Sequence, residues 1–281
     1  KVNFKYAISK KKIMITSIDA KIRSSWQVPD FKVLYWQGKQ QNYCVVIPVI
    51  NEGDRIINLL QRIVDSEVNK ISDVIIVDGG SHDNSLVIER IQSLGVKGLL
   101  LKTSDGKLSA QLRCAYAFAL DQGYEGIITI DGNNKDDPEA IPRFIESLNK
   151  GIDFVQASRF IKGGKGENVP LYRILAIRYI HATILSFASG FKWTDTTQGF
   201  RAYSKKILLD TKIAPFRNIF KTYELLAYMS YRVPKLGYRC CELPTKRKYP
   251  KGKIITKING LKNHLILFVI LLKACIGFYN N

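Results

Sequence analysis

A regular alternation of short apolar runs and amphipathic stretches begins at Tyr43, and it constrains the fold more than any other feature of the sequence. The apolar runs are rich in Val and Ile and lack strict apolar–polar alternation, which is typical of strands buried on both faces. They predict strands at residues 43–47, 73–78, 98–101, 126–131 and 154–158, with amphipathic helices at 54–65, 85–94, 109–122 and 138–149. This order predicts an α/β fold, in which a mostly parallel, Rossmann-like sheet is flanked by helices.

Capping and breaker residues refine this prediction. Asp83 or Asn84 is the expected cap of the helix at 85–94, because short polar side chains accept hydrogen bonds from the first helical N–H groups. The glycine-rich stretch at 163–166 predicts a mobile loop, and a long helical stretch at 171–189 follows it. Residues 31–36 and 238–243 have the composition of two further strands.

The basic residues are unevenly distributed. The net charge is +19, of which residues 1–45 carry +7, residues 46–200 carry −2 and residues 201–281 carry +14. Positive segments attract phosphates, whether on nucleic acid, on lipid headgroups or on a phosphorylated substrate. We therefore divide the chain into an N-terminal extension at 1–42, a central α/β domain at 43–210 and a basic, helical C-terminal region at 211–281.

The C-terminal apolar run at 265–272 is expected to be either a buried helix or an interfacial helix on a membrane. It is shorter than the ~20 apolar residues that span a bilayer. The surrounding positive charge favours the membrane surface. The five cysteines are scattered and odd in number, which fits a reducing compartment better than a disulfide framework. We expect a cytoplasmic protein bound peripherally to the inner face of the membrane.

Acidic residues stand at the ends of two expected strands. Asp78 ends one of them, and Asp131 ends another and opens the polar cluster at 131–138. The carboxyl ends of parallel strands meet at one edge of a sheet, where nucleotides bind. Carboxylate and amide oxygens are the ligands of hard divalent cations, which often share them with phosphates. The sequence therefore predicts nucleotide and metal chemistry at this edge.

Five segments, in order, resemble the motifs of family 2 glycosyltransferases with the GT-A fold. They are Val-Val-Ile-Pro-Val-Ile-Asn-Glu at 45–52, Val-Asp-Gly-Gly-Ser at 77–81, Asp-Gly-Asn at 131–133, Ala-Ser-Arg-Phe-Ile-Lys-Gly-Gly at 157–164, with Tyr-Arg at 172–173, and Thr-Gln-Gly-Phe-Arg-Ala-Tyr at 197–203. The segments at 157–164, 172–173 and 197–203 are similar to those of the polyprenyl-phosphate sugar transferases, of which dolichyl-phosphate mannose synthase is the best known. The resemblance covers roughly residues 44–203.

The resemblance implies a nucleotide-sugar donor, with UDP favoured over GDP, and Mg²⁺ or Mn²⁺ as the cofactor. The implied donor residues are Pro48, Ile50 and Glu52 around the base, Asp78 on base or ribose, Lys107 on a phosphate, and Asp131 with Asn133 on the metal. Asp131 is also the implied catalytic residue, because the metal that it holds offsets charge on the leaving diphosphate. Two positions on the donor side depart from the family pattern: Asn133 replaces a carboxylate, and Ile50 replaces a tyrosine near the base.

The resemblance also implies that the domain at 43–210 is catalytic, that the region at 211–281 lies on the acceptor side, and that Arg159 and Arg173 bind the phosphate of a polyprenyl-phosphate acceptor. Arg201 and the basic group Lys246, Arg247 and Lys248 are further candidates for binding a phosphate. Arginine suits this role because its planar fork stays charged and binds phosphate oxygens bidentately. The acceptor phosphate is then the nucleophile, and it displaces the nucleotide directly with inversion. Ile177 stands where the related enzymes have a hydroxyl residue, so that contact is missing.

Two other functions are compatible with the sequence. The same fold can transfer sugar to a hydroxyl in capsule, lipopolysaccharide or other cell-surface glycan synthesis. That reaction needs a general base, for which Asp195 is the candidate. The basic tail also suits a nucleic-acid-binding protein, but it lacks a recognisable nucleic-acid motif, and the strand-end acids would repel phosphates. We expect no nucleic-acid partner.

Overall fold

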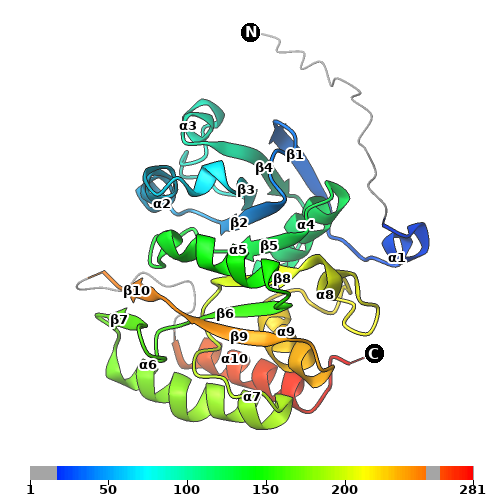
Figure 1. The fold of residues 1–281 in the computed structure, drawn as a ribbon, viewed down its shortest axis with the longest axis vertical. Helices are drawn as coiled ribbons and strands as arrows, with labels where there is room; N and C mark the ends of the chain where they lie inside the picture. The colour runs from blue at the N-terminus through cyan, green and yellow to red at the C-terminus, as the bar shows by residue number, and fades with distance from the viewer. Residues whose placement is uncertain (1–17, 251–259, 281) are drawn as a thin grey trace.

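The computed structural model describes residues 18–250 and 260–280. Its centre is an eight-stranded sheet with the order β1-β4-β3-β2-β5-β8-β6-β9 (Figure 1). The strands are β1 (Phe31–Trp36), β2 (Tyr43–Val49), β3 (Asp73–Asp78), β4 (Val96–Lys102), β5 (Gly126–Thr129), β6 (Phe154–Ser158), β8 (Arg201–Ser204) and β9 (Cys240–Pro244). Only β1 and β8 run antiparallel to their neighbours in this sheet. The predicted mostly parallel α/β fold is confirmed.

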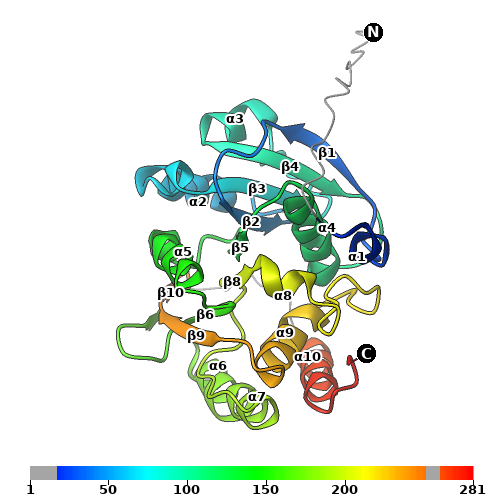
Figure 2. The same ribbon diagram turned by 45° about the vertical axis from the view of Figure 1, so that its right-hand side comes forward.

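The helices of the first half cover both faces of the sheet (Figure 2). They are α2 (Asp54–Asp65), α3 (Ile88–Ser93), α4 (Leu108–Asp121) and α5 (Ile141–Asn149), the last preceded by a 3-10 turn at Pro138–Ala140; a short α1 (Ala20–Ser24) and a 3-10 turn at Val68–Lys70 complete this half. Helices α2, α3 and α5 pack on one face, while α4 packs on the other. Each face of the sheet therefore has its own hydrophobic core, and successive strand residues pack into opposite cores. Val45 and Ile47 pack into the core under α2, α3 and α5, whereas Cys44 and Val46 pack into the core under α4.

Helix α3 begins three residues later than predicted, and neither predicted cap holds it. Its N-cap is Val87, which makes no side-chain cap bond. The Asp83 carboxylate instead accepts hydrogen bonds from the backbone N–H of Gly53 at 2.7 Å and of Ser85 at 3.1 Å. Asp83 thus ties two loops together, and a tertiary contact replaces the local cap that the sequence suggested.

The second half adds helices at the β6–β9 end of the sheet. They are α6 (Leu171–Leu175), a π-helical stretch at Ala176–His181, α7 (Ala182–Ser189), α8 (Lys205–Leu209), α9 (Glu224–Lys235) and α10 (Gly260–Cys275). Helices α7, α9 and α10 lie against one another below the sheet (Figures 1 and 2). A single π-helical turn inside an α-helix is rare, and such turns often mark functional sites.

Two strands of the main sheet come from outside the predicted catalytic range of 43–210. Strand β1 belongs to the expected N-terminal extension, and β9 belongs to the expected C-terminal region. The predicted loop at 163–166 overlaps β7 (Lys165–Glu167), which pairs in parallel with β10 (Lys246–Lys248). The basic residues at 251–259 lie outside the described part of the chain.

Among the described residues, no helix is both long and apolar enough to cross a membrane. Helix α10 buries Ile270, Leu271 and Ala274 against α9 and exposes Leu265 and Leu272. One face of this helix is therefore buried, as the first expectation requires, and another apolar face is exposed. Contact of that face with a membrane stays a prediction.

Candidate active site

Asp78 and Asp131 lie at the same edge of the sheet, as predicted. Asp78 is the last residue of β3, and Asp131 follows the end of β5 by two residues. Strand β2 lies between these two strands, so the two strand ends lie about two strand spacings, or about 10 Å, apart. The backbone at Gly132 packs closely on β2, because a Cβ there would lie 3.2 Å from the carbonyl oxygen of Pro48.

The Asp78 carboxylate holds the turn that follows it. It accepts hydrogen bonds from the backbone N–H of Gly80 at 3.1 Å and of Ser81 at 2.9 Å, and from the Ser81 hydroxyl at 2.7 Å. Asp78 is 7% exposed. The carboxylate therefore shapes the loop at this strand end, and its contact with base or ribose stays a prediction.

The loops after β2 and β3 are joined side by side. The backbone N–H of Asn51 donates to the Ser81 hydroxyl at 3.0 Å, and the Asn51 side chain accepts from the backbone N–H of His82 at 2.8 Å. Asn51 adopts a left-handed backbone conformation with φ of 50°, which asparagine tolerates better than most residues. The buried Glu52 carboxylate accepts from Arg55 at 2.8 Å. Ile50 and Glu52 thus lie on one braced loop, directly after the end of β2, in which Pro48 is buried.

Asp131 contacts a residue from the far end of the chain. Its Oδ2 lies 3.2 Å from Nη2 of Arg247, whose Nη1 lies 2.6 Å from both carboxylate oxygens of Asp136. Asp136 is fully buried, and burial raises its pKa to about 6 even though Arg247 opposes the shift. Asp136 was not among the predicted site residues. Its only signal in the sequence was its position in the polar cluster after Asp131.

Oxygen donors of the type that divalent cations prefer are present at this loop. The Asp131 side chain is 23% exposed, whereas the Asn133 side-chain oxygen accepts a hydrogen bond from the backbone N–H of Lys135 at 3.1 Å. In the described residues, no group of three or more His, Cys, Asp or Glu side chains forms a ready-made metal cage. The donor set therefore fits a cation held by Asp131, with Asn133 beside it, that completes its coordination with phosphate oxygens.

Arg159 and Arg173 meet at the ring of Tyr249. Arg159 donates from Nη1 to the Tyr249 hydroxyl at 3.2 Å, and the Arg173 guanidinium carbon lies 5.6 Å from the ring centroid. The Arg247 guanidinium lies 5.8 Å from the same ring. Burial opposes ionisation of Tyr249, but the positive charges of Arg247, Arg159 and Arg173 lower its pKa below the usual value. Nothing in the sequence signalled Tyr249.

Asp195 and Arg201 do not have the exposure that their predicted roles need. Asp195 is fully buried and holds Arg159 through two contacts, from Nε at 2.7 Å and from Nη2 at 3.0 Å. Arg201 is also fully buried and donates to the carbonyl oxygens of Gln198, Leu226 and Thr196. In this structure Asp195 positions Arg159, and Arg201 braces the core where β8 meets α9. Their roles as a general base and as a phosphate ligand stay predictions.

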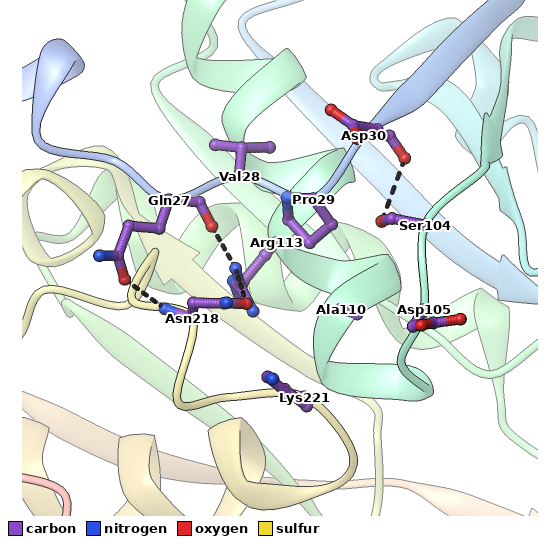
Figure 3. A pocket seen from close by; sticks show the side chains of 10 residues that line it. All are labelled: Gln27, Val28, Pro29, Asp30, Ser104, Asp105, Ala110, Arg113, Asn218 and Lys221. Carbon is purple, nitrogen blue, oxygen red and sulfur yellow. Dashed lines mark hydrogen bonds between the residues drawn. The ribbon is translucent and has the colours of Figure 1, made fainter.

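Lys107 stands directly before α4, where its backbone N–H donates to the carbonyl oxygen of Lys221 at 2.8 Å. Its side chain is exposed, and the ammonium lies 5.9 Å from the ring of Tyr223. Next to this loop, a hollow of about 360 Å³ is lined by residues that include Gln27, Ser104 and Arg113 (Figure 3). The Arg113 guanidinium donates there to the carbonyl oxygens of Gln27 and Phe220. This hollow contains none of the predicted site residues.

The chain belongs to glycosyl transferase family 2, whose model matches residues 44–211. It is therefore a glycosyltransferase, and the resemblance found in the sequence is confirmed. It is 29% identical over 221 residues to the undecaprenyl-phosphate mannosyltransferase of Micrococcus luteus, which covers 76% of this chain and 88% of the relative. It is 24% identical over 209 residues to the polyprenol monophosphomannose synthase of Mycolicibacterium smegmatis, covering 73% of this chain and 76% of the relative.

Solved structures share the fold at low sequence identity. One is glucosyl-3-phosphoglycerate synthase from Mycobacterium tuberculosis in complex with Mn²⁺, UDP-glucose and phosphoglyceric acid, with a TM-score of 0.56 and 15% identity over 84% of this chain and 80% of that chain. Another is mannosyl-3-phosphoglycerate synthase from Rubrobacter xylanophilus, with a TM-score of 0.56 and 13% identity over 83% of this chain and 72% of that chain. At this identity the likeness establishes the GT-A fold alone.

Proposed function

We propose that the protein transfers a sugar from a nucleotide-sugar donor to polyprenyl phosphate. One observation carries the proposal: Arg247 touches Asp131 on the donor side and lies over Tyr249, where Arg159 and Arg173 meet on the acceptor side. A carboxylate suited to a donor metal and a cluster of cations suited to a second phosphate are thus direct neighbours. The relatives named for polyprenyl-phosphate mannosyl transfer support the same acceptor.

On the donor side, the end of β2 at Pro48, the braced loop that carries Ile50 and Glu52, and the turn held by Asp78 would receive the nucleoside. Asp131 would hold Mg²⁺ or Mn²⁺, and the side-chain oxygen of Asn133, two residues further on, would be a second ligand. When bound, this cation supplies Lewis-acid stabilisation of the negative charge that develops on the leaving diphosphate. The glucosyl-3-phosphoglycerate synthase with Mn²⁺ and UDP-glucose, which shares this fold, supports UDP over GDP and a divalent metal.

On the acceptor side, an oxygen of the lipid phosphate would form the new bond to the anomeric carbon. The bond from that carbon to the diphosphate breaks, its electron pair leaves with the nucleoside diphosphate, and the configuration inverts. No protein base is needed, because the phosphate is already anionic. Arg159 is held rigid by Asp195, and the partly exposed Arg173 would meet the incoming phosphate.

Transfer to a sugar hydroxyl is the second candidate, with Asp195 as the base. The burial of Asp195 and its two contacts with Arg159 count against this role. The two candidates differ in a direct assay. Radiolabelled nucleotide sugars are incubated with the protein, with and without polyprenyl phosphate, and with and without EDTA. We expect label in the lipid fraction only when polyprenyl phosphate is present and EDTA is absent. Failure of every common donor to label polyprenyl phosphate would refute the proposed acceptor.

We also propose that the protein binds the inner membrane surface peripherally through α6, α7 and α10. Most of the exposed large apolar side chains of the described residues lie on these helices and their flanks, among them Tyr172, Tyr179, Phe187, Leu265 and Ile276. Arg178 and Lys273 lie beside aromatic rings of the same surface. Apolar side chains with interspersed cations are the composition that binds anionic bilayers.

A further inference from the structure

Arg247 bridges two carboxylates that differ in strength of contact and in burial. Its Nη1 lies 2.6 Å from both oxygens of Asp136, whereas its Nη2 lies 3.2 Å from one oxygen of Asp131. The side chain of Asp136 is 0% exposed and that of Asp131 is 23% exposed. Asp136 is therefore the buried anchor of the guanidinium, and Asp131 is the weaker partner that faces solvent.

The backbone delivers this guanidinium to the strand-end loop. Arg247 is the middle residue of β10 and is paired with Gly166 of β7. On either side of it, the backbone N–H of Lys246 donates to the Asp137 carboxylate at 3.1 Å, and that of Lys248 donates to the carbonyl oxygen of Lys135 at 2.8 Å. Three neighbouring residues thus fasten β10 to the loop that carries Asp131, so the position of Arg247 is built into the fold.

A guanidinium and a divalent cation compete for the same carboxylate. Oδ2 of Asp131 already accepts from Arg247, and like charges a few Å apart in a partly buried site repel strongly. Both carboxylate oxygens of Asp131 therefore become available to a metal only when the contact between Asp131 and Arg247 is broken. Asp136 can keep the guanidinium meanwhile, so Arg247 does not become an uncompensated buried charge.

We propose that Arg247 is a built-in cation of the donor site. Held by Asp136, it neutralises Asp131 in the metal-free protein and yields Asp131 when a divalent cation binds. The released N–H groups then face the phosphates, next to Tyr249 and the two arginines of the acceptor side. This inference rests on the proposed role of Asp131 in the donor site. It makes Arg247 the link between metal loading and the charge offered to the two phosphates.

The test measures Mn²⁺ binding to the whole protein without donor or acceptor, from the paramagnetic resonance signal of free Mn²⁺ at about pH 8, where free carboxyl groups are ionised. Arg247→Gln is expected to lower the Kd for Mn²⁺ about tenfold, because the resident competitor is gone. Arg143→Gln is the matched control. This variant removes a positive charge from α5. The Arg143 guanidinium donates to the Pro244 carbonyl oxygen rather than to Asp131 or Asp136. Its Kd is expected to stay within about twofold of wild type.

A second variant covers the case in which Arg247→Gln leaves Asp136 buried without a partner and unfolds the protein. The double variant Arg247→Gln with Asp136→Asn replaces the buried ion pair by two neutral amides that can hydrogen-bond each other. It is also expected to bind Mn²⁺ more tightly than wild type. Wild-type or weaker affinity in the folded variants would overturn the proposal. Because the readout is metal binding alone, a negative sugar-transfer assay would count against the proposed function and leave this result standing.

Discussion

The donor loops and the arginine cluster are held in place by different forces. The loops after β2 and β3 are joined by exposed hydrogen bonds from backbone N–H groups, such as those from Asn51 to Ser81 and from Gly53 to Asp83. The cluster around Tyr249 depends on buried charge, with Arg159 on Asp195 and Arg247 on Asp136. Removing one exposed hydrogen bond lowers the free energy of unfolding only a little. Removing one partner of a buried ion pair lowers it much more, because the other partner is left as an uncompensated charge. The acceptor side should therefore be the more fragile region.

The largest effect is expected for Asp195→Asn. The Arg159–Asp195 pair is 1% and 0% exposed, so the variant should lose about 3–5 kcal/mol of unfolding free energy in urea titrations. Asp121→Asn is the matched control, because the Arg23–Asp121 pair is 39% and 30% exposed and should cost less than about 1 kcal/mol. Similar losses in the two variants would remove the distinction between the regions. Unchanged stability with a large fall in kcat would instead support Asp195 as a base.

Asp131→Asn should act on transfer rather than on stability. Removing a carboxylate that holds the cation on the leaving diphosphate should lower kcat about 10²–10³-fold in the polyprenyl-phosphate assay. Urea unfolding should change by less than about 1 kcal/mol, because Asp136 still holds Arg247. Retained activity in a folded variant would exclude Asp131 from the donor site.

His181 should make the acceptor side sensitive to acid. Its Nδ1 lies 2.6 Å from the Thr196 hydroxyl, and burial, with the charge of Arg201, lowers its pKa to about 4. The unfolded chain binds this proton near pH 6.5 and the folded chain does not, so stability should fall as the pH drops from about 6.5 to about 4, by up to about 3 kcal/mol. Urea titrations across this range should show a flatter curve for His181→Asn. An unaltered curve in that variant would assign the acid sensitivity to other groups.

Phe187→Asp should weaken membrane binding with little effect on the fold, because Phe187 is 94% exposed. Losing one apolar side chain from a lipid contact, worth about 1.5–3 kcal/mol, should reduce the partition coefficient about tenfold or more in vesicle flotation with anionic phospholipids. Val87→Asp, at the start of α3 and 48% exposed, is the control and should float like wild type. Equal loss in both variants would argue against a specific membrane face.

The smallest effect is expected for Lys107→Gln. An exposed lysine that meets a donor phosphate should contribute less than about 1 kcal/mol, which is a few-fold rise in the KM for the nucleotide sugar. The rise should shrink at high salt, since exposed charges are screened. An unchanged KM at low salt would make Lys107 an ordinary loop residue.

The alternation of apolar runs was sufficient to predict the central strands and the helices α2 and α4, because burial on both faces of a parallel sheet leaves a clear local pattern. It also placed Asp78 and Asp131 at one edge, since strand direction follows from that alternation. Helix α3 was predicted too long at its start, because Asp83 is taken up by the Gly53 backbone N–H rather than by the helix. Local capping rules carry no information about such a partner.

The roles of the arginines could not be read in the same way. Arg159, Arg201 and Arg247 look alike in the sequence, yet one holds a buried aspartate, one braces carbonyl oxygens and one bridges two carboxylates. Motif, period and strand order are properties of neighbouring residues, and they defined the family, the sheet and its acidic edge. Which cation meets which anion depends on contacts across as many as 116 positions, and these exist only once β9 and β10 have packed beside β6 and the Asp131 loop.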